Sequence, residues 1–230
     1  MKTIGILGGM SWESTALYYK WINEGIRMRL GGLHSASLLL DSCDFAEMER
    51  LQAGGKWLAI GKILSEKALK LENAGAGGLL IATNSMHEVA DEIERSINVP
   101  LLHIADSVGR AVSSEGITKV GLLGTKFTME RSFYTGRLKD KFGIAILVPE
   151  TKGRDEVHRI IYQELCRGIV RGSSKKACIE IMSDLEERGA QAIVMGCTEI
   201  GLLVDQGDTV IPLYDTARLH ADTAVAWMLE

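Results

Sequence analysis

LENAGAGGLLIATNS, at Leu71–Ser85, returns later in the chain as LEERGAQAIVMGCTE, at Leu185–Glu199, after an offset of 114 residues. Two further pairs of similar segments occur in the same order: TIGILGG at Thr3–Gly9 with KVGLLGT at Lys119–Thr125, and VPLLHIAD at Val99–Asp106 with IPLYD at Ile211–Asp215. One such match could arise by chance, but three in register indicate that a unit of half the chain has been duplicated. We therefore expect two halves with the same fold.

Short apolar runs alternate with longer amphipathic stretches along both halves. The runs expected to form strands are Thr3–Leu7, Ser37–Leu40, Gly78–Ile81, Lys119–Leu123, Ala145–Val148 and Ala192–Met195. The stretches expected to form helices are Ser14–Arg29, Trp57–Asn73, His87–Arg95, Met129–Phe142, Arg154–Arg167 and Ser173–Arg188. Strands that alternate with helices are typical of βαβ units and parallel sheets. The predicted fold class is therefore α/β, with two pseudo-symmetric domains that each contain a parallel sheet.

The duplication aligns Thr83 with Cys197, because the two positions are also 114 residues apart. Each residue follows a predicted buried strand, and ligands of open α/β sheets bind just past the carboxyl ends of strands. Two pseudo-symmetric domains would direct both side chains into one cleft between them. A small polar residue after a strand could equally do no more than cap the next helix. The equivalence of the two positions in the repeat favours a functional pair.

The composition is that of an ordinary globular protein and argues against several classes of partner. Hydrophobic residues make up 46% of the chain, charged residues 24%, and the net charge is −4. No cluster of Lys and Arg with interleaved aromatic residues occurs, so we expect no nucleic-acid partner. The sequence shows no signal-peptide pattern and no apolar run long enough to span a bilayer, so we expect no membrane association.

The cysteines and histidines lack the spacing of a metal site. Cys43, Cys166, Cys178 and Cys197 form no CxxC pair, so they are expected to be reduced, which favours a cytoplasmic location. The first three are interpreted as small buried hydrophobic residues. The histidines show no HxxxH pattern, and His87, at a predicted helix start, is expected to be exposed although it could reach the cleft. The loop GILGGM does not complete a GxGxxG fingerprint, so we expect neither a metal nor a dinucleotide.

The motifs IGILGGMSWEST, ATNSMH, GCTEIGLL and IPLYDTARLHA resemble those of the aspartate/glutamate racemase family, and the resemblance extends from Ile4 to Ala221. It implies two pseudo-symmetric α/β domains with the active site in the cleft between them. It further implies a homodimer that acts on a small acidic amino acid without pyridoxal phosphate or any other cofactor. The segment from Pro212 onward is expected to cross back to the first domain. The expected domains are thus residues 1–98 plus 212–230, and residues 99–211.

In this family two side chains flank the α-carbon of the substrate, one removing its proton and the other returning a proton to the opposite face. Cys197 matches the cysteine of the second half, and Thr83 takes the place of the first-half cysteine. A free cysteine has a pKa of about 8.5, so a modest lowering at a helix start would give a useful thiolate. A threonine hydroxyl donates a proton readily but deprotonates poorly. We therefore expect a cofactor-independent racemase of aspartate, glutamate or both, with modest activity.

The resemblance also assigns residues around this pair. Substrate contacts are expected from Met10, Gln52, Asn84, Ser85, Thr125 and Thr198. Possible supporting residues are Ser11, Glu164 and Glu199. Some of these side chains could instead be helix caps, Thr125 among them. Glu199 could orient a partner, accept the thiol proton, or be an acid favoured by the dipole at a helix start.

Three other features leave alternatives open. Gln52 stands beside a Gly-Gly turn, where a glutamine is usually on the surface, and Glu164 lies in a predicted helix, where a glutamate is usually solvated. Arg50 is near Gln52 and could pair with the distal carboxylate of a substrate.

Two other functions remain compatible with the sequence. Thr83 leaves open a decarboxylase or isomerase of a related acid that works with a single cysteine. A protein that only binds acidic amino acids on a disabled racemase scaffold is the third reading. The sequence does not separate aspartate from glutamate, because one methylene shifts a binding pocket by only about 1–3 kcal/mol.

Overall fold

The computed structural model describes all residues from Met1 to Glu230, and the chain divides into two compact units. Unit 1 comprises Met1–Ile104 and His220–Glu230, and unit 2 comprises Ala105–Leu219. The chain therefore passes from one unit to the other twice, after Ile104 and after Leu219.

Unit 1 is built on a parallel sheet with the strand order β2-β1-β3-β4. The strands are β1 (Ile4–Gly8), β2 (Leu38–Ser42), β3 (Gly78–Ile81) and β4 (Leu101–Leu102). The helices of this unit are α1 (Trp12–Leu30), α2 (Phe45–Ala53), α3 (Trp57–Asn73), the 3₁₀ helix η1 (Ser85–Val89) and α4 (Ala90–Ser96). Strands β1 and β3 are buried along their whole length, as expected for strands with helices on both faces.

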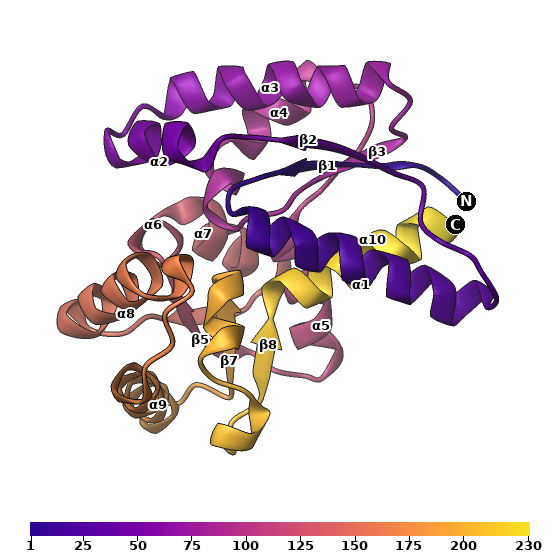
Figure 1. The fold of residues 1–230 in the computed structure, drawn as a ribbon. Coiled ribbons are helices and arrows are strands. Elements are labelled where there is room, and N and C mark those ends of the chain that lie inside the picture. The colour runs from indigo at the N-terminus through magenta and orange to yellow at the C-terminus, as the bar shows by residue number, and fades with distance from the viewer. The chain divides into compact units, whose positions relative to one another are not determined.

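The last helix, α10 (Thr216–Leu229), packs against unit 1 over most of its length. Figure 1 shows α10 beside α1 on one face of the first sheet, with α2, α3 and α4 on the other. The two helices pack closely, because a Cβ at Gly25 would lie 2.8 Å from Val225 Cγ2. Trp227 packs on β3, where a Cβ at Gly78 would lie 2.7 Å from its ring.

Unit 2 repeats this plan with the strand order β6-β5-β7-β8, again all parallel. The strands are β5 (Lys119–Gly124), β6 (Ala145–Leu147), β7 (Ala192–Gly196) and β8 (Leu213–Asp215). The helices are α5 (Ile104–Ser114), α6 (Lys126–Glu130), α7 (Ser132–Phe142), α8 (Thr151–Gln163), α9 (Gly172–Glu187) and the 3₁₀ helices η2 (Leu165–Arg167), η3 (Thr198–Leu202) and η4 (Gln206–Asp208). Helices α5 and α7 are joined by Asp106, which accepts hydrogen bonds of 2.6 Å from Arg137 Nε and Lys141 Nζ.

Equivalent positions in the two sheets are packed in the same way. A Cβ on Gly5, in β1, would collide with the Leu79 side chain, and one on Gly121, in β5, would lie 2.6 Å from Ile193 Cδ1. Leu79 and Ile193 are themselves equivalent in the repeat. The two sheets thus share strand order, direction and internal contacts, which confirms the predicted pseudo-symmetric α/β fold.

Some element boundaries differ from the prediction. The single helix expected over Met129–Phe142 is two helices, α6 and α7, because Arg131 between them has extended backbone angles. Helices α2, α5 and α10 lie outside the stretches named above as expected helices. Strand β8 pairs with β7, so residues 212–219 lie with unit 2, and the chain returns to unit 1 at His220. The first passage, from unit 1 to unit 2, comes after Ile104.

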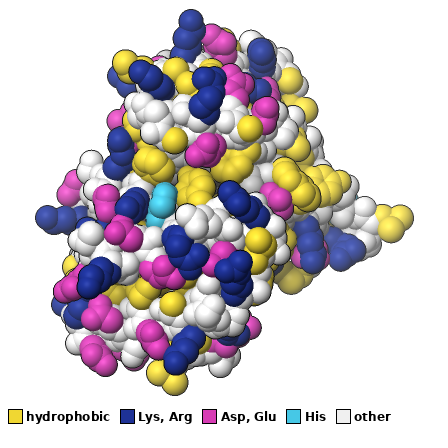
Figure 2. Space-filling view, turned by 60° about the vertical axis from the view of Figure 1, so that its left-hand side comes forward, with side chains coloured by type: hydrophobic (Ala, Val, Ile, Leu, Met, Phe, Trp, Pro, Cys, Tyr) yellow, Lys and Arg dark blue, Asp and Glu magenta, His cyan; other side chains and the backbone are white.

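The surface and the helices show two further properties. Lys and Arg side chains are interspersed with Asp and Glu on the face seen in Figure 2. No helix combines the length with the apolar composition that a membrane span requires.

Candidate functional site

The candidate residues lie at the carboxyl ends of the central strands of each sheet. In unit 1, Ile81 at the end of β3 pairs with Leu7 of β1, and the ladder continues as Ala82 N donates to Leu7 O at 2.9 Å. Thr83 therefore lies beside the loop that follows β1. In unit 2, Gly196 at the end of β7 pairs with Gly124 at the end of β5. Cys197 is consequently the neighbour of Thr125 across the strand ends.

The loop after β1 leads directly into α1 through Gly9, Met10 and Ser11. Gly9 has a φ of +83°, and a Cβ there would collide with the backbone of Cys43. Only glycine fits both conditions. Ser11 Oγ accepts a 3.3 Å hydrogen bond from Ser14 N, so Ser11 is the N-cap of α1. Met10 and Ser11 are both buried.

The loop after β3 carries the first catalytic candidate. Thr83 is half-buried, whereas Asn84, the N-cap of η1, and Ser85, its first residue, are buried. The carbonyl of Thr83 accepts a 2.9 Å hydrogen bond from His87 Nδ1. His87 is only 2% exposed, so the expectation of an exposed helix-start histidine is wrong. The ring therefore lies back against the loop that carries Thr83.

Gln52 and Arg50 lie on the same helix but in different surroundings. Gln52 is 2% exposed in α2, although Gly54 and Gly55 follow it, so the usual surface location does not apply. Met48, one turn earlier on α2, is buried as well. Arg50 is exposed. Gln52, and not Arg50, is thus the long polar side chain of α2 that faces the interior.

In unit 2 the catalytic candidate Cys197 forms a tight cluster with the two residues that follow it. The Cys197 Sγ thiol donates to Glu199 Oε2 at 2.9 Å, and Thr198 Oγ1 donates to the same oxygen at 2.7 Å. Glu199 is buried. Of the alternatives for Glu199, acceptance of the thiol hydrogen bond is the one that the geometry shows.

These surroundings raise the pKa of the Cys197 thiol instead of lowering it. Burial, the negative charge of Glu199 and the neighbouring Cys166 hold the pKa of Cys197 well above its ordinary value. The lowering of the pKa expected at a helix start does not occur, because burial of the thiol and the adjacent carboxylate of Glu199 both act in the opposite direction. The resting thiol is therefore protonated, and its proton has an acceptor at hydrogen-bonding distance.

Thr125 and Thr198, both predicted substrate ligands, use their hydroxyls within unit 2. Thr125 Oγ1 accepts from Thr128 N at 3.3 Å, so Thr125 is the N-cap of α6, as Ser11 is of α1. Thr198 donates to Glu199, as described above. Each hydroxyl has an oxygen with further hydrogen-bonding capacity, so capping and ligand binding are compatible.

Glu164 is not solvated, as a helical glutamate usually would be, but 2% exposed at the end of α8. Its Oε2 accepts from Ser174 Oγ at 2.6 Å and its Oε1 from Arg159 Nη1 at 2.7 Å, with Arg171 Nη1 at 3.9 Å. These hydrogen bonds hold the pKa of the carboxyl below its ordinary value. Glu164 thus fixes the segment that leads into η2 and Cys166.

The remaining thiols differ in their surroundings. All four cysteines are free. Cys178, in α9, is buried, and burial raises its pKa to about 12. Cys43 is half-buried, and burial raises its pKa too. Burial in this way suits the predicted structural role of Cys178.

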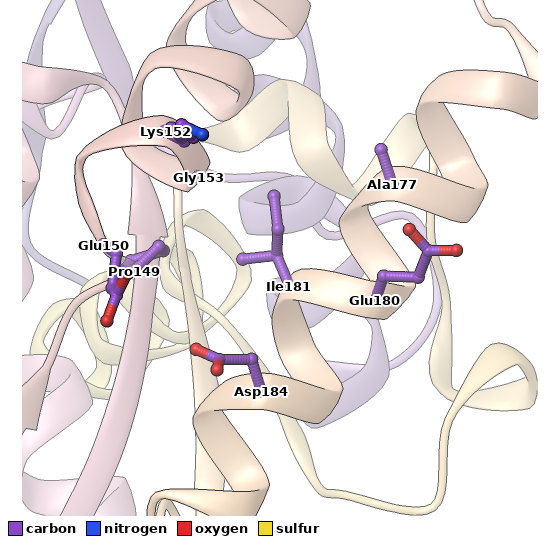
Figure 3. Close-up of a pocket in the computed structure, with 8 residues that line it drawn as sticks. All are labelled: Pro149, Glu150, Lys152, Gly153, Ala177, Glu180, Ile181 and Asp184. Carbon is purple, nitrogen blue, oxygen red and sulfur yellow. The ribbon is translucent and has the colours of Figure 1, made fainter.

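A pocket of about 320 Å³ lies between α8 and α9 of unit 2 but contains none of the candidate residues. Figure 3 shows its lining: Pro149, Glu150, Lys152, Gly153, Ala177, Glu180, Ile181 and Asp184. Three carboxylates against one ammonium make it a poor receptor for an acidic ligand. The strand-end residues therefore remain the candidate site.

Comparisons with known proteins show which chains this one resembles. A sequence model of the Asp/Glu/hydantoin racemase family matches residues 7–224. The broad specificity amino-acid racemase RacX of Bacillus subtilis (strain 168) is 21% identical over 246 residues, which covers 98% of each chain.

Solved structures extend the similarity to the whole fold. A proposed Asp/Glu racemase from Yersinia pestis is 48% identical, with a TM-score of 0.95 over 100% of both chains. An aspartate racemase homologue from Pyrococcus horikoshii OT3 is 35% identical, with a TM-score of 0.87 over 100% of both chains.

Proposed function

The chain belongs to the Asp/Glu/hydantoin racemase family, and from that premise we propose that it racemises an acidic amino acid by proton transfer at Cα without a cofactor. The observation that carries this proposal is the equivalence of Thr83 and Cys197 at the carboxyl ends of β3 and β7. Inversion of a carbon centre requires a base on one face and an acid on the other. Two equivalent side chains of proton-transferring type satisfy that requirement.

Cys197 and Glu199 supply the chemistry of one face. The thiol proton moves from Sγ to Oε2 of Glu199, and the thiolate so formed takes the α-proton of the substrate. One negative charge is present before and after the first transfer, so no second charge is created in the buried site. Thr83 returns a proton to the opposite face from its hydroxyl. Exchange with solvent water then returns a proton to Thr83 and removes the one held by Glu199, and the steps run in reverse for the other enantiomer.

We assign the substrate contacts to the residues named from the family resemblance. Asn84, Ser85 and Thr198, which follow the two catalytic positions in the chain, are proposed to hold the α-carboxylate. Met10, Gln52 and Thr125 are proposed to enclose the rest of the molecule. Ser11, as the cap of α1, and Glu164, as the anchor before η2, support these segments.

The decisive test is proton exchange in D₂O with purified protein. The α-proton signal of each of the four substrates, L- and D-aspartate and L- and D-glutamate, is followed by NMR, and the preferred acid is the one that exchanges faster. We expect both enantiomers of at least one acid to lose the signal and to interconvert. Failure of all four to exchange would refute the proposed activity.

Thr83 also supports a second candidate, a decarboxylase or isomerase that needs only Cys197. A threonine hydroxyl is a much weaker acid than a thiol, so one face carries a poor base. Product analysis with aspartate, glutamate and maleate separates the two functions. Racemisation yields only the enantiomer of the substrate, whereas the alternative yields carbon dioxide or a rearranged acid.

Replacing Thr83 with cysteine is expected to raise the racemisation rate by roughly tenfold, because a thiol is the stronger acid and its anion forms more readily. The gain is limited because Ser85 stands where Glu199 stands in unit 2, so the new thiol has no carboxylate acceptor. Circular dichroism of the aspartate or glutamate enantiomers measures the rate. Thr83→Ser, which keeps a hydroxyl, is the matched control, and a Cys variant no faster than it would contradict the base argument.

The homodimer and the cytoplasmic location implied by the resemblance are parts of this proposal. Light scattering on the purified protein tests the first, and cell fractionation tests the second. Neither is needed for the chemistry described above.

A further inference from the structure

Unit 1 contains a buried cluster of aromatic rings behind the Thr83 loop, consisting of Tyr18, His87, His103 and His220. The centroid of the His87 ring lies 4.4 Å from that of His103 and 5.9 Å from that of His220. The Tyr18 ring meets His220 edge-on at 5.6 Å. No part of the chemistry described so far uses these side chains.

Hydrogen bonding fixes the proton positions on His87. Nδ1 lies 2.9 Å from Thr83 O and 3.3 Å from Asn84 O, and carbonyl oxygens can only accept, so Nδ1 carries the proton. Nε2 accepts from Ile104 N at 3.2 Å, so it carries none. Burial, together with His103 and His220 nearby, lowers the pKa of His87 well below its ordinary value. The ring is therefore neutral.

His220 anchors the second passage of the chain in the same cluster. Its Nε2 donates to Leu102 O at 2.7 Å, so its Nδ1 accepts from Tyr18 Oη at 2.9 Å. Ile104 is the last residue of unit 1 before the chain enters unit 2, and His220 is the first residue after it returns. The cluster thus holds both ends of the unit 2 insertion to the core of unit 1.

We propose that His87 is a positioning residue for Thr83, tying the carbonyl of Thr83 to the backbone of Ile104 through its Nδ1–H tautomer. The peptide of Thr83 is fixed by this bond, and with it the direction of the Thr83 side chain. This inference rests on the proposed function, in which Thr83 serves one face of the substrate.

The second half of the chain has no equivalent ring. Residue 201, which is 114 positions after His87, is glycine, and the Cys197 carbonyl instead accepts from Ile200 N at 3.2 Å. The effect of His87 is consequently confined to the Thr83 face. A merely structural role would not distinguish the two faces.

Two amide variants separate the two hydrogen bonds. The amide nitrogen of His87→Asn falls near the place of Nδ1 and keeps a donor for Thr83 O. His87→Gln reaches the place of Nε2 and keeps a partner for Ile104 N but loses that donor. We expect kcat/KM to fall about tenfold in the Gln variant, the equivalent of one hydrogen bond, and to recover toward wild type in the Asn variant.

The discriminating readout is the α-deuterium isotope effect on kcat/KM, measured for each enantiomer. Slower proton transfer at Thr83 raises the isotope effect for the enantiomer that Thr83 deprotonates and lowers it for the other. These ratios depend only on folded molecules, so a reduced folded fraction does not obscure them. Tyr18→Phe, which disturbs the same cluster without touching the Thr83 loop, is expected to leave both ratios unchanged.

The outcomes separate the two proposals. Isotope effects that diverge between the two enantiomers in His87→Gln and return to the wild-type values in His87→Asn support the positioning role. Isotope effects equal to those of wild type, or an Asn variant no better than Gln, overturn it while leaving the racemase intact. A wild-type protein that exchanges no α-proton refutes the proposed function itself. Imidazole ¹⁵N shifts test the tautomer directly, and an Nε2–H form of His87 also overturns the positioning role.

Discussion

Replacing Cys197 with serine is expected to lower racemisation by about 10²–10⁴-fold, the usual contribution of a well-placed acid–base group. The serine hydroxyl can still donate to Glu199 over a similar distance, so the cluster should keep its shape. It cannot form an anion of comparable stability, because an alcohol is a far weaker acid than a thiol. Both directions must slow equally in kcat/KM, since the equilibrium constant of racemisation is one.

The isotope effects identify which face has been lost. In the Cys197→Ser variant, the enantiomer deprotonated at position 197 should show the larger α-deuterium effect, the reverse of the pattern expected for His87→Gln. Cys43→Ser, which changes the half-buried thiol of unit 1, is the matched control and should keep wild-type activity. A Cys197→Ser variant within a few-fold of wild type would remove the cysteine from the mechanism.

The second large effect concerns Glu199. Glu199→Gln is expected to slow racemisation by about 10–100-fold near neutral pH, because the thiol loses the base that activates it. In the wild-type protein, proton transfer from Sγ to Glu199 moves the negative charge of the carboxylate to the sulfur and creates no new charge. With glutamine, a thiolate must be created where there was no charge, in a buried place that disfavours it.

The effect of Glu199→Gln on the rate should depend on pH. Burial, the largest cause of the raised pKa of Cys197, persists in the Gln variant, so its thiol ionises only in alkaline solution. Activity of the variant should therefore rise with pH above the ordinary cysteine range, and the deficit relative to wild type should shrink. Glu187→Gln, the same change on an exposed residue of unit 2, is the control. A variant with the wild-type rate and pH profile would limit Glu199 to a structural role.

The sequence repeat was sufficient to predict the paired sheets and the strand-end positions of Thr83 and Cys197. Both depend on local patterns, namely apolar strands and the residues that follow them. The two-residue spacing of Cys197 and Glu199 was also visible in the sequence. Their hydrogen bond was not, because it depends on how the short helix η3 turns the carboxylate back.

Other properties of the site depend on contacts between distant segments. Glu164 is buried because Ser174 and Arg159 donate hydrogen bonds to its carboxylate. The sequence around Glu164 does not predict a contact with a serine ten residues later on another helix. His87 is buried because β4 and α10 bring His103 and His220 against it. Sequence periodicity describes one element at a time, so it cannot supply these partners.

The two passages of the chain between its units have a consequence for synthesis. A ribosome makes the whole of unit 2 before it reaches His220–Glu230, the segment that completes unit 1. Until that segment emerges, Gly78 lacks the Trp227 ring and Lys2 N lacks its 2.8 Å hydrogen bond to Met228 O. The N-terminal half of the nascent protein is therefore finished last, which reverses the order in which domains usually fold during translation.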